Sequence, residues 1–360
     1  MKLTKNIGLI IALALIIGTI AILEFKKSND PPVLSEKIAI STNTSGRDLT
    51  TKQSLYPAAV ELVSPDGYHN INNITLQENI GKKIIIIDFW TYSCINCQRT
   101  LPYLNAWHEK YSDDGLLIIG VHTPEFAFEK DYANVQRAIE KYGVKYPVVQ
   151  DNDYQIWRSY RNQYWPHKYL IDIDGYIVYH HIGEGGYQET ESKIQELLQE
   201  RKQVLNLNKT VEHDLVSTIQ NPNFGRIGTP ELYFGYKFER GQLGNTQKWK
   251  PEKQVQYVLP ESREANSFYL SGTWFNHPDS MELVDKSGTI HLTYTAKTIN
   301  IVAGSQEPTT LTLLLDGKEY RTVTIKDFDL YTLVNESEYG THDIEIRAAK
   351  GLMAYTFTFG

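Results

Sequence analysis

The sequence predicts an α/β domain, then an all-β sandwich, with one transmembrane helix at the N-terminus. Three observations lead to this prediction. Near the N-terminus, Ile7–Leu23 are seventeen uncharged, mostly apolar residues. An isoleucine-rich segment at 84–90 is followed by a helical pattern, and from about residue 207 short alternating segments replace that pattern. A length of 360 residues suits two such domains.

The N-terminal apolar run is long enough to cross the hydrocarbon core of a bilayer. Lysines flank it on both sides, so the charges leave its orientation open. A cleaved secretory signal is the alternative, but no small-x-small site is clear near residues 24–30. We expect residues 1–27 to be an uncleaved anchor and residues 28–55, which are polar and contain Pro, Ser and Thr, to be a tether. The absence of another span and the dithiol described below place the folded domains outside the cytoplasm.

Composition narrows the classes of function. The net charge is −7, without the basic footprint that nucleic-acid binding requires. The ten histidines contain no H-x(3–5)-H pair and only two cysteines are present, so a zinc site lacks ligands. Covalent haem would need a histidine directly after the second cysteine, where Gln98 stands. We expect no metal and no cofactor.

The two cysteines, Cys94 and Cys97, lie between a predicted buried strand and a predicted helix. Continuous apolar β-branched residues, as in segment 84–90, are typical of a central strand covered on both faces. From residue 101 to 111 the apolar residues recur at helical spacing. A helix N-terminus lowers a thiol pKa, so we expect Cys94 to be the exposed attacking thiolate and Cys97 the buried resolving thiol. A structural disulfide is the alternative, although so short a loop closes little chain entropy.

Two acidic residues are candidates for proton transfer to this dithiol. Asp88 ends the apolar strand, where desolvation would raise its pKa and let it exchange a proton with Cys97. Glu125 follows the next apolar strand, 116–121, and parallel strands end at one edge of a sheet. A capping or solvated acid is the alternative for each. We interpret the nearby His122 as a polar loop residue, with a role in tuning the site as the alternative.

The segment DFWTYSCINC resembles thioredoxin-fold oxidoreductases of the TlpA/ResA-like branch, and most closely the exported part of DipZ-type proteins. The similarity covers about 150 residues, so we assign 56–206 to a thioredoxin-like domain. The resemblance implies an α/β thioredoxin fold, with a central mixed sheet flanked by helices. The resemblance implies that Cys94 and Cys97 form a redox-active disulfide. It makes Asp88 equivalent to the buried acid of thioredoxins and Glu125 to the acid of the TlpA/ResA branch. The main proton carrier therefore stays open.

The same resemblance implies a groove for substrate. Pro166 matches the proline that is cis in the family and faces the dithiol, and Trp165 precedes it. A cis proline presents the preceding backbone to an extended peptide without donating an N–H of its own. Trp90 matches the aromatic residue that precedes the active-site loop. We therefore expect Trp90, Trp165 and Pro166 at the substrate groove.

Residues 207–360 read as short alternating strands with a hairpin turn at Leu315–Lys318, which favours a jelly-roll-like β-sandwich. TPELYFGY (229–236) and the closing AYTFTFG resemble the domain that follows thioredoxin in DipZ-type proteins, a fold similar to carbohydrate-binding modules. Glycan is thus a candidate ligand. Six aromatic residues are candidates for a sugar-stacking platform, although core packing is the commoner role: Tyr233, Tyr236, Trp249, Tyr257, Tyr269 and Trp274.

We expect a membrane-anchored, extracytoplasmic thiol–disulfide oxidoreductase. Its resemblance favours a reductant of protein disulfides, with cytochrome c maturation and the rescue of exported thiols as the alternative roles. DipZ-type proteins carry a multi-helix electron-transfer domain and this chain has one predicted span, so electrons would come from a separate membrane donor of the CcdA/DsbD type. The alternatives are a surface protein that binds glycan or protein and uses the thioredoxin fold as a scaffold, and a metallochaperone.

Overall fold

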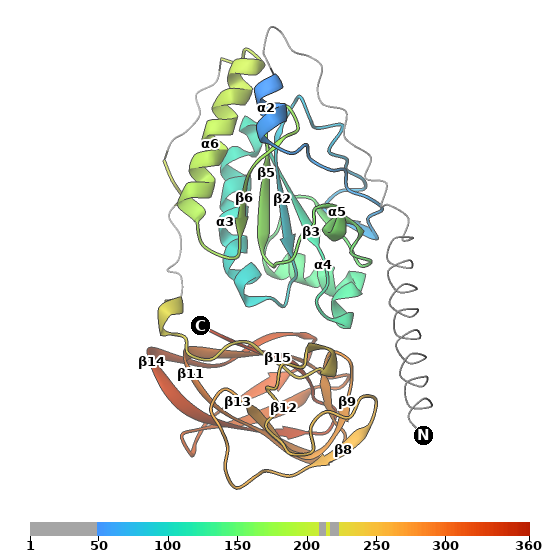
Figure 1. The fold of residues 1–360 in the computed structure, drawn as a ribbon, viewed down its shortest axis with the longest axis vertical. Helices are drawn as coiled ribbons and strands as arrows, with labels where there is room; N and C mark the ends of the chain where they lie inside the picture. The colour runs from blue at the N-terminus through green and yellow to red at the C-terminus, as the bar shows by residue number, and fades with distance from the viewer. Residues whose placement is uncertain (1–48, 209–213, 217–222) are drawn as a thin grey trace, which may run out of the picture.

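The computed structural model describes residues 49–208, 214–216 and 223–360, which form two folded units stacked along the long axis (Figure 1). The predicted anchor, 1–27, and most of the predicted tether lie outside the described residues. Within the described residues, no helix combines the length and the apolar character needed to span a membrane. The last residues of the predicted tether are helical (α2, Thr50–Leu55).

Helix α2 is tied to the first unit by one lysine. The Nζ atom of Lys52 lies 2.6 Å from Asp172 Oδ2 and 2.8 Å from Asp174 Oδ2, and it also contacts Glu200. Asp172 and Asp174 are buried, so their negative charges need a partner. Lys52 therefore attaches residues 50–55 to the domain, although no side chain of α2 is buried.

The first unit is a six-stranded mixed sheet in the order β1-β4-β3-β2-β5-β6, flanked by helices (Figure 1). Strands β2, β3 and β4 are parallel, whereas β1, β5 and β6 run antiparallel to their neighbours. This is the predicted thioredoxin fold. The strands are β1 (Gly67–His69), β2 (Ile84–Trp90), β3 (Leu116–His122), β4 (Val148–Gln150), β5 (His167–Ile171) and β6 (Ile177–Ile182). The helices are α3 (Ile95–Tyr111), α4 (Tyr132–Lys141), α5 (Gln155–Ser159) and α6 (Tyr187–Val204).

Strand β2 lies in the middle of this sheet, and all seven of its residues are buried. Ile84 and Ile86 pack on the face covered by α3, α4 and α6. Ile85 and Ile87 pack on the opposite face, against α5 and the segment that precedes β2. The isoleucine run is needed because both faces of this strand are covered, as the sequence predicted.

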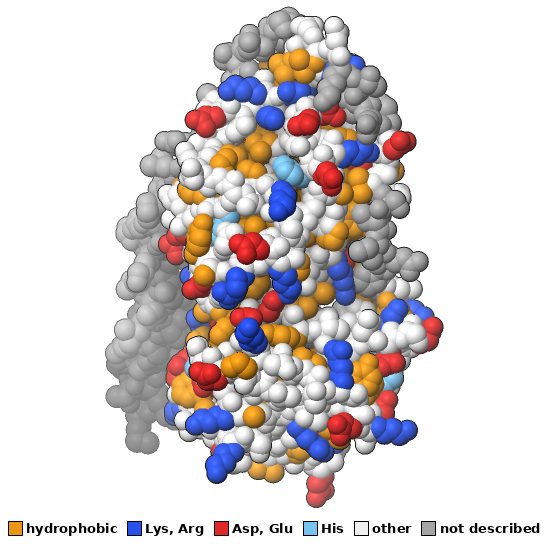
Figure 2. All heavy atoms as spheres, turned by 180° about the vertical axis from the view of Figure 1, so that it is seen from behind, with side chains coloured by type: hydrophobic (Ala, Val, Ile, Leu, Met, Phe, Trp, Pro, Cys, Tyr) orange, Lys and Arg blue, Asp and Glu red, His pale blue; other side chains and the backbone are white. Residues whose placement is uncertain are grey.

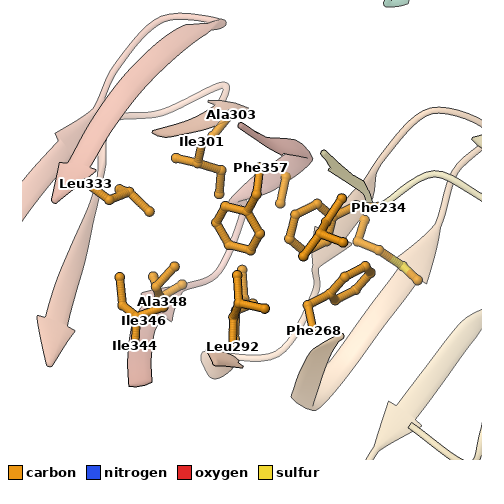
Figure 3. Packing of buried hydrophobic residues seen from close by; sticks show 14 of the residues in the cluster. Phe234, Phe268, Leu292, Ile301, Ala303, Leu333, Ile344, Ile346, Ala348 and Phe357 are labelled. Carbon is orange, nitrogen blue, oxygen red and sulfur yellow. The ribbon is translucent and has the colours of Figure 1, made fainter. Parts of the chain in front are cut away.

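The second unit is all-β, as predicted, and its nine strands belong to one sheet (Figure 1). Buried apolar side chains from opposite walls meet in its centre, among them Phe234, Phe268, Leu292 and Phe357 (Figure 3). The strands are β7 (Leu232–Tyr233), β8 (Gln254–Tyr257), β9 (Phe268–Asn276), β10 (Met281–Leu283), β11 (Ser287–Gly304), β12 (Thr309–Leu315), β13 (Lys318–Ile325), β14 (Asp329–Ala349) and β15 (Met353–Phe359). Asp316 and Gly317, both at positive φ, form the predicted hairpin turn between β12 and β13.

Strands β11 and β14 are long, and each takes the place of two short strands that the sequence predicted. Strand β11 pairs with β9 over 289–292 and with β15 over 299–304, so it belongs to both walls of the unit. A register shift between Ala296 and Thr298 interrupts its pairing with β14, and such irregularities bend a strand. Strands β11, β15, β10 and β9 therefore form a closed ring of hydrogen-bonded neighbours, with β8 and β13 as edge strands. The sheet is barrel-like, where the sequence predicted a sandwich.

Five of the six aromatic residues proposed for a sugar platform are at most 7% exposed, and only Tyr236 is less buried. Trp249, Tyr257 and Trp274 belong to the central core of the second unit, so these three have the core-packing role that was the alternative to sugar stacking.

On the face shown in Figure 2, acidic and basic side chains are interspersed over both units.

The two units meet through an apolar cluster, here called the interdomain cluster. Its buried members are Phe126 from the first unit and Tyr233, Val302 and Tyr355 from the second. The rings of Phe126 and Tyr355 lie 5.2 Å apart. Phe126 follows β3 by only four residues, so this contact brings the second unit to the edge of the sheet where the cysteines lie.

Candidate active site

Cys94 and Cys97 lie at the start of α3, as predicted. Cys94 is the N-cap residue, and its Sγ accepts a hydrogen bond from the backbone N–H of Cys97 at 3.4 Å. Cys94 is partly exposed, whereas Cys97 is 1% exposed. Burial raises the pKa of Cys97 well above its usual value, and the hydrogen bond with Cys94 and the charge of Asp88 add to this effect. The Cys94 thiol is thus accessible to a substrate, whereas the Cys97 thiol is buried and its ionisation is disfavoured.

Asp88 lies near the end of β2, close enough to Cys97 for its charge to raise the pKa of that thiol. It is 1% exposed, and its Oδ1 has no hydrogen-bond partner in the described part of the chain. Desolvation raises the pKa of Asp88 from 3.8 to about 7, and the positive charge of Lys168 opposes part of this rise. A carboxyl group with a pKa near neutrality can both accept and return a proton at physiological pH.

Lys168 is a site residue that the sequence analysis missed. It faces Asp88 directly in the β2–β5 register, is fully buried, and donates from Nζ to the carbonyl of Gly183 at 3.2 Å. Burial lowers its pKa, whereas the charges of Asp88 and Cys97 favour its charged form. A lysine in the strand that follows Pro166 was the available signal, because a charge inside an apolar strand needs a partner.

Glu125 lies in the loop after β3, three residues beyond His122, and lines the same cavity as Cys94. Its Oε1 accepts a hydrogen bond from Tyr233 of the second unit at 2.8 Å. Desolvation raises the pKa of Glu125 to about 8, and the charges of Glu231 and Glu129 add to the rise. Glu125 is therefore mostly a neutral acid at pH 7, able to donate a proton.

Glu129, also missed from sequence, joins the two loops of the site. Its Oε1 accepts from Ser93 Oγ at 2.6 Å, and its Oε2 accepts from the backbone N–H of Glu125 at 2.6 Å and of Phe126 at 2.9 Å. The residue is fully buried, and burial raises its pKa. Its carboxyl group fixes Glu125 relative to the loop that carries Cys94.

The predicted groove residues differ in position. The Trp165–Pro166 peptide bond is cis, and Trp165 lines a cavity together with Cys94. The indole N–H of Trp165 donates to the carbonyl of Thr123 at 3.0 Å. Trp90 does not reach the groove, because it is fully buried in the core under the active-site loop. Its contribution is to pack beneath the loop.

His122 is not a polar loop residue. It is the last residue of β3, it is fully buried, and its ring stacks on that of Tyr92 at 5.7 Å. Burial lowers the pKa of His122 to about 3, with a further contribution from His69, so the imidazole is neutral. The interpretation as a loop residue was wrong because the strand runs one residue further than its apolar pattern.

One small group of acids has the spacing of metal ligands in the described residues. Carboxylate oxygens of Asp172, Asp174 and Glu200 lie within 4.8 Å of one another. The ammonium group of Lys52 occupies the space between them. This group is a salt-bridge network that attaches α2.

The active-site cavity lies between the two units and measures about 90 Å³. Both units contribute to its lining, a feature that the sequence did not predict. From the first unit come Ser93, Cys94, Asn96, Glu125 and Trp165, and from the second Glu231, Tyr233, Val302, Thr356 and Thr358.

Protein-family models match each of the two units. The AhpC/TSA family model matches residues 58–180, and the model described as "Thioredoxin like C-terminal domain" matches 229–360. The thiol–disulfide oxidoreductase ResA of Bacillus thuringiensis (strain Al Hakam) is 31% identical over 134 residues, which cover 35% of this chain and 75% of ResA.

Similarity to the protein DipZ of Mycobacterium tuberculosis (strain CDC 1551 / Oshkosh) extends through both units. The two are 37% identical over 288 residues, which is 79% of this chain. The match spans 40% of the length of DipZ. A solved thiol–disulfide isomerase from Corynebacterium glutamicum aligns with 18% identity and a TM-score of 0.36, over 40% of this chain and 97% of its own.

Proposed function

Because this chain belongs to the thioredoxin-like thiol–disulfide oxidoreductases, we propose that it reduces protein disulfides outside the cytoplasm. The observation that carries the proposal is the pair of sulfurs at the start of α3, one accessible and capping the helix, the other buried. Attack by one thiolate followed by resolution by its neighbour requires this asymmetry.

In the first step, the Cys94 thiolate attacks one sulfur of a substrate disulfide. A bond forms between Cys94 Sγ and that sulfur, the substrate S–S bond breaks, and the second substrate sulfur leaves as a thiolate. Glu125 lines the same cavity as Cys94 and is protonated at neutral pH, so we assign it the proton that the leaving thiolate takes.

In the second step, Cys97 attacks Cys94 Sγ and releases the other substrate sulfur. Cys97 must first lose its proton, which its burial disfavours. Asp88 interacts electrostatically with Cys97 and titrates near neutrality, so we assign it this proton. The substrate gains two electrons and the Cys94–Cys97 disulfide forms. We thus assign one of the two proton transfers to Glu125 and the other to Asp88. The sequence had left open which of them is the main proton carrier.

A donor must return two electrons to the Cys94–Cys97 disulfide. We propose a membrane donor of the CcdA/DsbD type, with residues 1–27 as an uncleaved anchor that holds the domains on the extracytoplasmic side. We propose an envelope protein of this kind, with cytochrome c maturation as one role. We also propose that the thioredoxin-like domain spans residues 56–206 and the β domain residues 207–360.

The test is reduction of a protein disulfide, such as those of insulin, by the purified chain with dithiothreitol as electron source. We expect catalysis that Cys94→Ser abolishes. Activity that survives Cys94→Ser would refute the proposal. A midpoint potential of about −120 mV, as in strong oxidants, would refute the assignment as a reductant.

The alternative of a glycan-binding surface protein has weaker support. Five of the six aromatic residues that would stack on sugar are buried among other side chains. Glycan binding that is independent of the redox state of Cys94 and Cys97 would favour it.

A further inference from the structure

The second unit contributes polar side chains to the cavity that contains Cys94. Tyr233 and Glu231 are adjacent to each other there, on and just before strand β7. Tyr233 Oη lies 2.8 Å from Glu125 Oε1 and 3.1 Å from Glu231 Oε2. One phenol therefore joins an acid of the first unit to an acid of the second.

Tyr233 is held in place by packing. Its side chain is 7% exposed and belongs to the interdomain cluster. Its ring stacks on that of Phe238 at 4.9 Å, and the guanidinium group of Arg240 lies 5.6 Å from its centroid. The hydroxyl therefore has little freedom to turn away from Glu125.

The hydrogen bonding of these three groups is limited by one proton. A tyrosine hydroxyl has a single hydrogen, so it donates to one carboxylate at a time, and its oxygen accepts only from a group that carries a proton. With both Glu125 and Glu231 ionised, one of the two short contacts would join two acceptors. When one of the two carboxyl groups is protonated, each short contact joins a donor to an acceptor. Repulsion between the two negative charges also favours the protonation of one carboxyl group.

We propose that Tyr233 is a positioning residue for Glu125 and that Glu231 controls when Glu125 releases its proton, so the second unit forms part of the active site. This inference rests on the proposed function, in which Glu125 supplies a proton to the leaving thiolate. The charged and titratable groups around Glu125 come from both units: Glu129, Glu231, Tyr233, Arg240 and Tyr154.

Substitution of the two residues should move the titration of Glu125 in opposite directions. Tyr233→Phe removes a donor to the ionised carboxylate, so the ionised form is less stable and the pKa of Glu125 rises. Glu231→Gln removes a neighbouring negative charge, so the pKa of Glu125 falls. We expect each shift to be about half a pH unit or more.

The experiment measures kcat/KM for insulin reduction against pH in the full chain. Glu125→Gln identifies the limb of the profile that belongs to Glu125, because this variant should lose it. We expect that limb to move to higher pH in Tyr233→Phe and to lower pH in Glu231→Gln. Tyr236→Phe is the matched control, since Tyr236 donates to Glu252 instead, and its profile should match that of the wild type.

Shifts in the same direction, or profiles identical to the wild type in both variants, would overturn the inference. A Glu125→Gln variant that keeps the wild-type pH profile would also overturn the inference. If activity still depends on Cys94 in that case, the proposed function stands. If Cys94→Ser instead keeps full activity, the proposed function fails. The ¹³C chemical shift of the Glu125 carboxyl group then still tests Tyr233 and Glu231 without reference to turnover.

Discussion

Asp88→Asn should stabilise the protein at alkaline pH. The pKa of Asp88 is raised from 3.8 to about 7, chiefly because the group is desolvated. The folded state therefore binds this proton more tightly than the unfolded state. It follows that stability falls as pH rises from about 4 to about 7, and stays reduced above that range. About three pKa units at 1.36 kcal/mol each amount to roughly 4 kcal/mol.

Asparagine mimics the neutral acid and has no proton to lose, so the variant escapes this penalty. We expect a free energy of unfolding close to the wild-type value at pH 4 and up to about 4 kcal/mol higher at pH 9. Urea unfolding under reducing conditions at both pH values measures the difference. Glu125 also titrates in this range but is common to both proteins, so it cancels. An equal loss of stability in variant and wild type between pH 4 and pH 9 would refute the reasoning, and the exposed Asp153→Asn is the control.

Three further outcomes are expected. Cys97→Ser should accumulate a mixed disulfide between Cys94 and substrate, visible by mass spectrometry as a mass increase that dithiothreitol reverses; the absence of any adduct would contradict the order of attack. Phe126→Ala should lower the free energy of unfolding by about 3–5 kcal/mol because it opens the interdomain cluster. The matched Phe224→Ala, at a side chain that is 52% exposed, should change it by under about 0.5 kcal/mol, and equal effects would count against the cluster. Lys52→Met should lower the free energy of unfolding by about 3 kcal/mol, because it removes the positive charge beside buried carboxylates. Thermal unfolding measures this change, and a loss below about 1 kcal/mol would show that the network is not needed.

Elements with a strong local pattern were predictable. Segment 84–90 is apolar throughout, and it forms the central strand whose seven residues are all buried. Cys94 precedes a helical spacing of apolar residues and caps that helix. The end of β3 was less well defined, since His122 is polar by composition and yet completes the strand in the core.

Site residues distant in sequence were not predictable in the same way. Lys168 faces Asp88 through strand pairing across 80 positions, and Tyr233 reaches Glu125 across 108. Trp90 matched an active-site aromatic by position, but only the packing around it showed that it lies below the loop. The lengths of β11 and β14 likewise depend on partners that continue past the local break in pattern.

The identity of the chemistry was present in the primary sequence, because two cysteines three residues apart at a helix start need only local geometry to act together. The proton affinities of the acids were not, because they depend on charges and water exclusion contributed through space by other segments. Tertiary structure alone decided that Asp88 lies within electrostatic reach of Cys97, that Glu125 and Cys94 line one cavity, and that a β domain forms part of its wall.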